Sequence, residues 1–185
     1  MRDDNERDLQ RLALWLEGLE RFRLPDWESL PQLDLYMDQV ILLLTRYLAP
    51  VERDQDERSI TSSIINNYVR MKVMPPPVKK KYSRVHIAYL VIICTLKQSL
   101  SISCIRQLLP EDQGEASVRA VYEDFVGQYR SAVALIRNIA GSGGCLPLKD
   151  GGLTMISAIL STLSKSLTEF LLQGDGEDGG YDDED

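Results

Sequence analysis

The spacing of hydrophobic residues along the chain predicts a protein built mainly of α-helices. Leucines recur every three or four positions over residues 5–22, a spacing that places them on one face of a helix. Residues 33–48 are apolar on most faces, so we expect a second helix there, at the centre of the fold. Between the two, residues 24–31 are bracketed by Pro25 and Pro31 and are expected to form a connector.

Shorter elements are expected in the middle of the chain. Thr61 is a suitable N-cap for a helix over about 62–73. The three prolines at 75–77 cannot continue a helical ladder, so we expect them to end this helix. Residues 78–82 are then expected to be extended, with at most a two-stranded stub over 73–82.

Four more helices are expected in the rest of the chain. Ser83 should cap a helix over 84–98, and a short helix should follow over 101–109. A long amphipathic helix is expected over 115–140 and a last helix over 153–172, with a glycine-rich loop between them. The apolar stripe of the long helix consists of Val118, Val121, Tyr122, Phe125, Tyr129, Val133 and Ile136.

Charge is distributed unevenly along these elements. The formal net charge is −7, and residues 174–185 alone hold seven acids and no base. We expect this tail to be disordered and solubilising, with competition for the basic segment as the alternative. Residues 58–110, in contrast, contain nine Lys or Arg residues and no Asp or Glu. Because carboxylates facing DNA would repel it, such a segment indicates a surface that meets phosphate groups.

The elements around this basic segment suggest a helix-turn-helix with a wing. The predicted helix over 62–73 carries short polar side chains opposite its apolar face, as a recognition helix requires. Asn66 and Asn67 can pair bidentately with adenine, and Arg70 can pair with guanine. The simpler alternative is that this polar face is only solvated.

Other residues of the segment are candidates for contact with the DNA backbone. Ser62 and Ser63 lie at the N-terminus of the predicted recognition helix, where backbone amides can hold a phosphate. Basic residues that follow the prolines would lie along the phosphates and release counterions on binding; the alternative for them is a solvated loop. These basic candidates are Lys79, Lys80, Lys81 and Arg84.

The sequence "ITSSIINNYVRMKVMPPPVKKKYSRVHIAYLVIICTLKQSLSISCIRQLL", residues 60–109, resembles the DNA-binding domain of MerR-type regulators. Those domains run through two helices, a pair of prolines, a basic wing, a "YS" sequence that opens a third helix, and a fourth helix. More closely, "LPDW", "INNYV" and "KKKYSRVHIAYL" together are similar to a domain of unknown function common in low-GC Gram-positive bacteria and presumed to be a MerR-like DNA binder. The positions that match MerR are Thr61, Ser62, Asn67, Tyr68, Val73, Pro75, Pro76, Tyr82, Ser83, Leu90, Ile93, Leu100, Ser101, Ile102, Ile105 and Leu109.

The resemblance implies an all-α fold with a winged helix-turn-helix core and four parts along the chain. They are an N-terminal helix and connector (1–32), a MerR-like domain (33–110), a C-terminal helical region (111–173) and the acidic tail (174–185). The chain departs from the MerR pattern in its loop before Thr61, its short wing, and its C-terminal helical pair in place of one coiled-coil helix.

The function that follows is a transcriptional regulator that binds double-stranded DNA. We expect a dimer, because one short recognition helix reads few base pairs and a second half-site multiplies specificity. The stripe at 118–136 is a candidate dimer surface, and its alternative is packing on 153–172 within one chain. The alternative function is a non-catalytic helical protein-interaction adaptor, in which the basic strip would meet an acidic partner.

Other functions find little support in the sequence. His86 is the only histidine and no nucleophile has a base at usable spacing, so we expect neither an enzyme nor a cofactor or metal site. The cysteines Cys94 and Cys104 should pack as small apolar side chains. Tyr68 and Tyr82 should also pack in the core, with base stacking as the alternative. The longest apolar run is too short to cross a bilayer and no secretory signal is evident, so we expect a cytoplasmic protein without a membrane partner.

Overall fold

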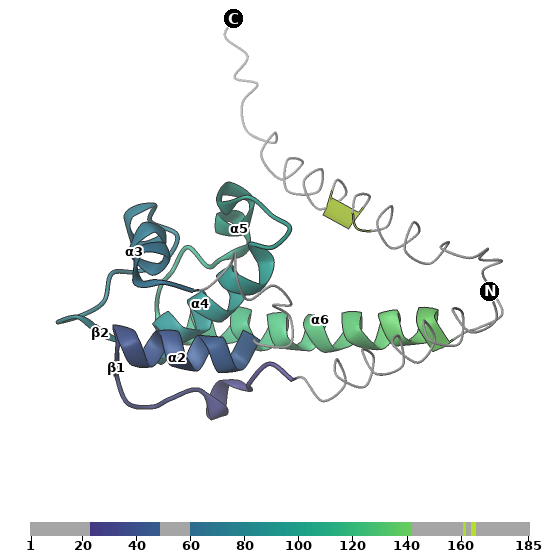
Figure 1. Ribbon diagram of the computed structural model, residues 1–185, viewed down its shortest axis with the longest axis horizontal. Helices are drawn as coiled ribbons and strands as arrows, with labels where there is room; N and C mark the ends of the chain where they lie inside the picture. The colour runs from purple at the N-terminus through teal and green to yellow at the C-terminus, as the bar shows by residue number, and fades with distance from the viewer. Residues whose placement is uncertain (1–22, 49–59, 142–160, 162–163, 166–185) are drawn as a thin grey trace, which may run out of the picture.

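The computed structural model describes residues 23–48, 60–141, 161 and 164–165. Within them the chain is mostly helical, as the sequence predicts, with one small antiparallel sheet (Figure 1). The elements are the 3-10 helix η1 (Trp27–Ser29), β1 (Leu35–Tyr36), α2 (Met37–Leu48), α3 (Ser62–Arg70), β2 (Lys81–Tyr82), α4 (Arg84–Leu96), α5 (Ile102–Leu108) and α6 (Glu115–Gly141).

Some predicted elements lie outside the described residues. These are the helix over 5–22, most of the loop before Thr61, the glycine-rich loop and the acidic tail. Of the helix expected over 153–172, only residues 161 and 164–165 are described, and all three are helical.

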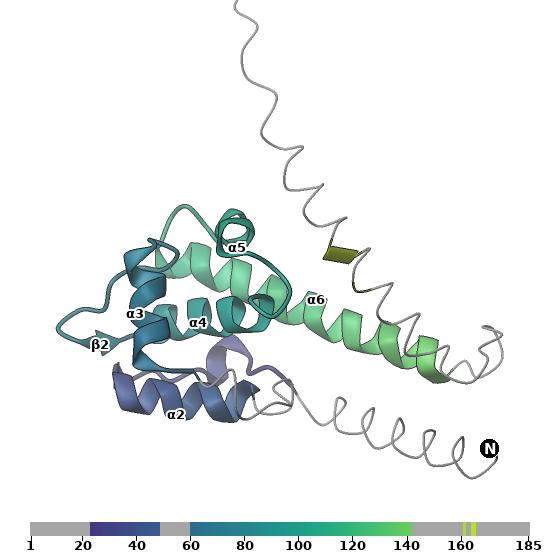
Figure 2. The same cartoon turned by 45° about the horizontal axis from the view of Figure 1, so that its top comes forward.

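The helix α4 is the centre of the fold. Every residue from His86 to Cys94 is buried, and α2, α5 and α6 all pack against this helix (Figures 1 and 2). The sequence pattern had placed α2 at the centre, and that prediction was wrong. The face of α2 that carries Val40 and Leu44 is buried, whereas Leu42 on the opposite face is exposed. Because the outer face of α2 also carries apolar residues, the sequence pattern of this amphipathic helix resembles that of a fully buried helix.

The small sheet joins the start of the fold to its middle. In β1 and β2, Leu35 pairs with Tyr82 and Tyr36 pairs with Lys81, in antiparallel register. The strand β2 therefore pairs with residues from before α2, and within the expected stub over 73–82 there is a single bridge, between Val78 and Lys81. This pairing also explains why α2 begins at Met37 and not at residue 33, since the two residues before it are extended in the strand.

The helix α3 ends by a backbone turn and not at the prolines. The Lys72 N–H donates to the Val69 carbonyl (3.0 Å) and the Val73 N–H donates to the Tyr68 carbonyl (3.1 Å). These two bonds are those of a Schellman motif, which needs a residue with positive φ just past the helix. Lys72 takes that conformation, with φ at 56°. The prediction of a helix to residue 73 was therefore three residues too long.

Side-chain caps are present at three helices, and those at Thr61 and Ser83 were expected from the sequence. Thr61 Oγ1 accepts from the Ile64 N–H (3.3 Å) at α3, and Ser101 Oγ accepts from the Cys104 N–H (3.2 Å) at α5. At α4, Ser83 and His86 form a capping box. Because these caps are local interactions, the starts of α3 and α4 were predicted to the residue, whereas α5 begins one residue later than expected, since Ser101 is its cap.

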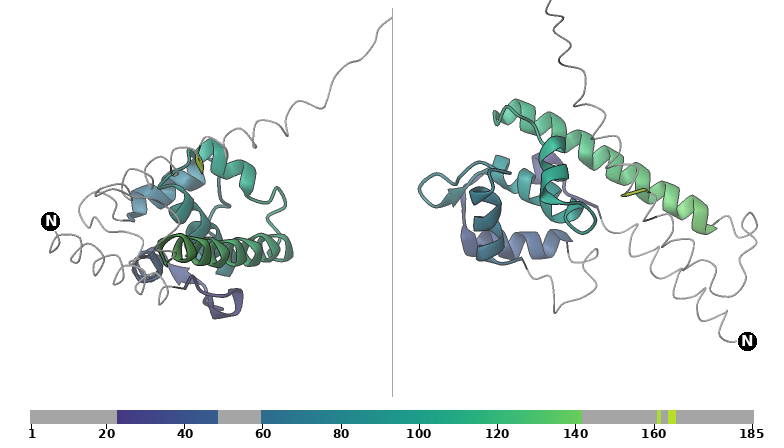
Figure 3. Two further views of the ribbon diagram at one scale, coloured as in Figure 1. Left: turned by 90° about the vertical axis from the view of Figure 1, so that its right-hand side faces the viewer. Right: turned by 90° about the horizontal axis from the view of Figure 1, so that it is seen from above.

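The long helix α6 divides into a packed half and a projecting half. Val118, Tyr122 and Val126 are buried against the rest of the fold, where α6 meets α4 and η1. Its second half extends beyond the other described elements (Figure 3), and Leu135 is 60% exposed. The first half of the expected dimer stripe is thus occupied within the chain, so only the projecting half is left for that role.

Candidate functional site

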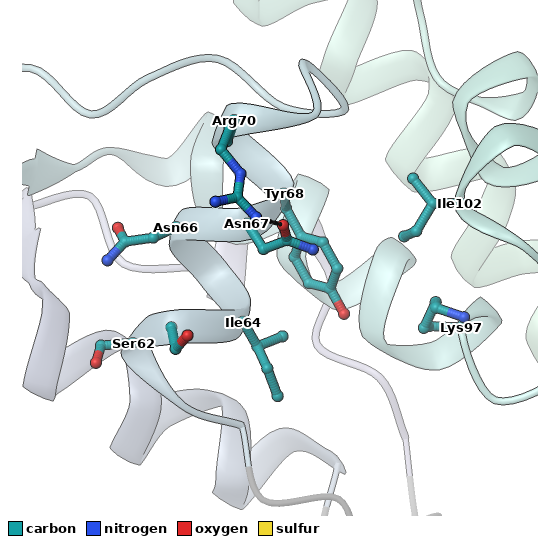
Figure 4. A pocket seen from close by; sticks show the side chains of 9 residues that line it. Ser62, Ile64, Asn66, Asn67, Tyr68, Arg70, Lys97 and Ile102 are labelled. Carbon is teal, nitrogen blue, oxygen red and sulfur yellow. Dashed lines mark hydrogen bonds between the residues drawn. The ribbon is translucent and has the colours of Figure 1, made fainter.

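The polar face of α3 forms one wall of an open groove of about 760 Å³ (Figure 4). The opposite wall comes from the end of α4 and the start of α5, through Lys97 and Ile102, and Tyr68 lies between the two walls. From α3 the lining residues are Ser62, Ser63, Ile64, Asn66, Asn67, Tyr68 and Arg70. All five polar α3 residues predicted as candidates are therefore brought together on one surface.

The opposite wall was not identified from the sequence. Lys97 is exposed at the C-cap of α4, and Ile102 is the first residue of α5. Their position beside α3 depends on how α5 folds back on α4, which no local pattern encodes. The only available signal for Lys97 was its place within the acid-free segment.

The apolar face of α3 fixes this helix on the core. Ile65 is fully buried and Tyr68 is nearly so, as the sequence predicted. Burial, with a smaller effect from Cys94, raises the pKa of Tyr68 to about 12, so its phenol stays protonated. A buried Tyr68 serves to seat the helix, and it is not free to stack on a base.

Arg70 and Asn67 contact each other at the outer edge of the groove. Arg70 Nη2 donates to Asn67 Oδ1 at 2.6 Å, and Asn67 Nδ2 lies 3.4 Å from Met71 Sδ. Asn66 is exposed and points away from this pair (Figure 4). The two asparagines, which the sequence treated alike, are thus in different situations.

The three wing lysines lie in a tight hairpin, and Lys79 and Lys80 form its tip. The N–H and carbonyl groups of Val78 and Lys81 bond to each other in both directions (3.1 and 2.9 Å), which leaves a two-residue turn. Lys79 and Lys80 occupy that turn with φ at 51° and 62°. Both side chains are exposed, and the tip projects from the same end of the molecule as α3 (Figures 2 and 3). The Lys81 ammonium lies over the Tyr36 ring, 5.4 Å from its centroid.

Arg84 does not belong with these residues. Its side chain is only 14% exposed, lies 5.6 Å from the Trp27 ring centroid and reaches Glu28 Oε2 at 3.6 Å. Arg84 thus serves to pack η1 on the core. It could bind a DNA phosphate only by giving up its ion pair with Glu28. The sequence could not show this, because the link between "LPDWESL" and Arg84 is purely tertiary.

The η1 segment that holds Arg84 is also attached to α6. Tyr122 Oη donates to the Pro25 carbonyl (2.8 Å), and the Trp27 and Tyr122 rings meet edge to face with centroids 6.0 Å apart. At the surface, Arg130 pairs with Asp26 at 2.6 Å. The connector predicted at 24–31 is therefore a packed bridge between α4 and α6.

His86 connects the wing to the central helix. Its Nδ1 lies 3.0 Å from the Ser83 N–H, and its Nε2 lies 3.1 Å from the Pro76 carbonyl. These partners require a neutral ring protonated at Nε2. Burial lowers the pKa of His86, against smaller raising effects from the Pro76 carbonyl and Asp34. His86 is a structural residue that holds the proline segment on α4.

Positive charge is concentrated in the segment that forms the groove and the wing. Residues 60–110, all of them described, contain eight Lys or Arg residues and no Asp or Glu. Six of the eight side chains are exposed: Arg70, Lys72, Lys79, Lys80, Lys97 and Arg106. The acid-free segment of the sequence is thus an exposed basic surface in the fold, which we call the basic face.

The described part of the chain holds neither a metal-binding cluster nor a membrane-spanning helix. No group of three or more His, Cys, Asp or Glu residues there is arranged to hold a metal ion. No helix among these residues is both long and apolar enough to span a membrane. Cys94 is buried in α4 and Cys104 is half-buried in α5, consistent with packing as small apolar side chains.

The arrangement of groove, wing and central helix falls within a recognised family. The family described as "Domain of unknown function (DUF1836)" matches residues 25–125, which is more than half of the chain. The chain therefore belongs to this family, and the matched region runs from the η1 segment into the packed half of α6. No curated protein and no solved structure gives a significant match.

Proposed function

We propose that this protein is a sequence-specific DNA-binding regulator of transcription with a MerR-like helix-turn-helix. In this proposal α3 enters the major groove, and the Lys79–Lys80 turn lies on the phosphate backbone. The observation that carries it is the basic face, on which the polar side of α3 and the wing belong to one acid-free segment of an otherwise acidic chain.

The backbone of the wing supports a functional role for its lysines. Both turn positions have positive φ, where Asn-Gly is the favoured pair and a long side chain is strained. Strained residues at an exposed tip add nothing to the core, so stability alone does not explain them. Contact between these ammonium groups and phosphate would explain why lysines occupy the turn.

The order of the elements supports the MerR-like assignment. A helix, a second helix, a pair of prolines, a short basic turn and two further helices follow one another through α2, α3, α4 and α5. Two departures remain: residues 49–61 separate α2 from α3, and the wing is only a two-residue turn. A short wing would contact fewer phosphates than a long one, so α3 would supply more of the specificity.

One observation favours the alternative function, a protein-interaction adaptor. Leu33, Tyr36 and Val78 are exposed in and beside the small sheet, and exposed apolar side chains that gather in one place are a mark of protein-interaction sites. In that case the basic face would bind an acidic protein partner.

Two substitutions on the basic face distinguish these functions. Arg70→Ala should remove a base contact, weaken binding to the preferred sequence by about 1–3 kcal/mol and relax preference at one base position. Lys80→Ala should weaken binding to all sequences alike and reduce the slope of log K against log salt by about one. The affinities and the salt slopes of both variants can be measured by fluorescence anisotropy titrations of labelled duplexes at several salt concentrations.

The matched control is Arg119→Ala, which removes a positive charge from outside the basic face. Arg119 pairs with Glu28 and Glu123, each at 2.9 Å, so its charge is already balanced. This variant should bind DNA as the wild type does. If Arg70→Ala and Lys80→Ala also leave DNA affinity unchanged, the regulator proposal fails and the adaptor is favoured.

A further inference from the structure

We infer that Asn67 is a positioning residue that fixes the Arg70 guanidinium for reading a guanine, and that Asn66 alone reads an adenine. This inference rests on the proposed function and names the bases that the exposed face of α3 takes.

The oxygen of Asn67 is already engaged. An asparagine that reads adenine accepts from the base N6 amino group with Oδ1 and donates to N7 with Nδ2. In this structure Asn67 Oδ1 accepts from Arg70 Nη2 at 2.6 Å, a short bond from a charged donor (Figure 4). To read adenine, Asn67 would have to share this oxygen with the guanidinium and turn its amide nitrogen away from Met71.

The orientation of the Asn67 amide follows from the same contacts. A guanidinium has no acceptor, so only the amide oxygen can face Arg70. The amide nitrogen then faces Met71 Sδ, 3.4 Å away, a weak acceptor at the end of the helix. Both ends of the side chain are therefore directed within α3.

Arg70 keeps enough donors for a guanine. A guanidinium has five N–H donors, and one of them goes to Asn67, which leaves four. Bidentate pairing with guanine O6 and N7 uses two. A neutral amide holds the arginine without cancelling its charge, whereas a carboxylate partner would neutralise it. A side chain fixed before binding also loses less rotamer freedom when it binds.

Asn66 is the amide that remains available. It is exposed, and its side chain makes no hydrogen bond with the described residues. It precedes Arg70 by four positions, which is about 6 Å along a helix axis and places both on neighbouring parts of one face. With base pairs about 3.4 Å apart, the adenine and the guanine should lie about two base pairs from each other.

The test is to determine the bound DNA motif for the full chain, for four single variants and for one double variant, with a thermal melt of each to confirm folding. The single variants are Asn66→Ala, Asn67→Ala, Asn67→Asp and Arg70→Ala, and the double variant joins Asn67→Ala with Arg70→Ala. Arg70→Ala should reduce preference at one guanine by about 5- to 150-fold. Asn67→Ala should reduce preference at that same guanine by about 2- to 12-fold, the value of one hydrogen bond. Asn66→Ala should instead act at an adenine about two positions away.

Asn67→Asp separates positioning from reading. An aspartate still accepts from Arg70, so guanine preference should remain while affinity for all sequences falls because of the added negative charge. In the double variant, Asn67→Ala should cause no loss of guanine preference beyond that of Arg70→Ala, since Asn67 acts on the guanine only by positioning the arginine.

Two results would overturn the inference. If Asn67→Ala alters an adenine position of its own and leaves the guanine untouched, Asn67 reads a base and the inference fails while the proposed function stands. If the wild-type chain selects no motif at all, the inference fails together with the proposed function.

Discussion

At the scale of single residues, His86 has the clearest chemical consequence. The ring must stay neutral to accept from the Ser83 N–H, and burial lowers its pKa below the ordinary value of about 6.5. The unfolded chain therefore binds this proton more tightly than the folded chain does. The contribution of His86 to stability is fully present above about pH 6.5 and is lost as the pH falls toward the lower, folded-state pKa.

We predict a loss of stability on mild acidification that depends on His86. Urea unfolding at pH 7.5 and pH 5.5 should show a lower free energy of unfolding at pH 5.5 for the wild type. His86→Gln should be less stable than the wild type at pH 7.5, by about 1–3 kcal/mol, because it leaves buried hydrogen-bonding groups unsatisfied. Its additional loss at pH 5.5 should be smaller, and an equal loss in both proteins would contradict the assignment.

The sequence predicted the environment of some side chains correctly and of others wrongly. Arg84 was expected to contact DNA because it follows the lysines, but Trp27 and Glu28 hold it in a contact that joins distant parts of the chain. The buried tyrosines were predictable, since Tyr68 repeats with Ile65 on one helical face. Helical periodicity encodes which face is buried, and it does not encode which distant side chain meets an exposed arginine.

At the scale of elements, the lysines of the wing turn have opposite effects on the stability of the fold and on the proposed binding of DNA. Two lysines at positive φ are costly for the fold, by about 1–2 kcal/mol each in general for side chains larger than glycine. Asn and Gly suit these two positions of a two-residue hairpin turn. A change that improves the turn while removing its charge should move stability and DNA affinity in opposite directions.

We predict this outcome for the double variant Lys79→Asn, Lys80→Gly. Its free energy of unfolding should rise by about 1 kcal/mol, seen as a higher melting temperature. Its DNA affinity should fall for every sequence, with the salt slope reduced by about two. A variant that is more stable and binds DNA unchanged would mean that the wing does not contact phosphate.

The helices were more predictable than the sheet for a physical reason. Thr61, Ser83 and Ser101 cap their helices through bonds to residues three positions away, so a short stretch of sequence is enough to place them. The strands β1 and β2 have two residues each and pair across the whole of α2 and α3. Strands this short carry no alternating pattern, so their pairing could not be predicted.

At the scale of the whole molecule, the fold separates two surfaces. The groove and wing lie at one end, and the second half of α6 projects at the other (Figure 3). The packed half of α6 is held on α4 by η1, through Tyr122 and Trp27. A regulator built this way would read DNA at one end and leave the projecting half of α6 for a second copy of the chain.

The most direct test of DNA reading is selection from a random double-stranded library. The purified full chain is incubated with the library at about 150 mM salt, where weak electrostatic binding is largely screened, and the retained DNA is sequenced. We predict an enriched motif with two related half-sites that contain guanine and adenine, as expected for a dimer. If no motif is enriched and only weak binding is seen, which disappears as salt rises, the protein is not a sequence-specific regulator, because the basic face then attracts phosphate without reading bases.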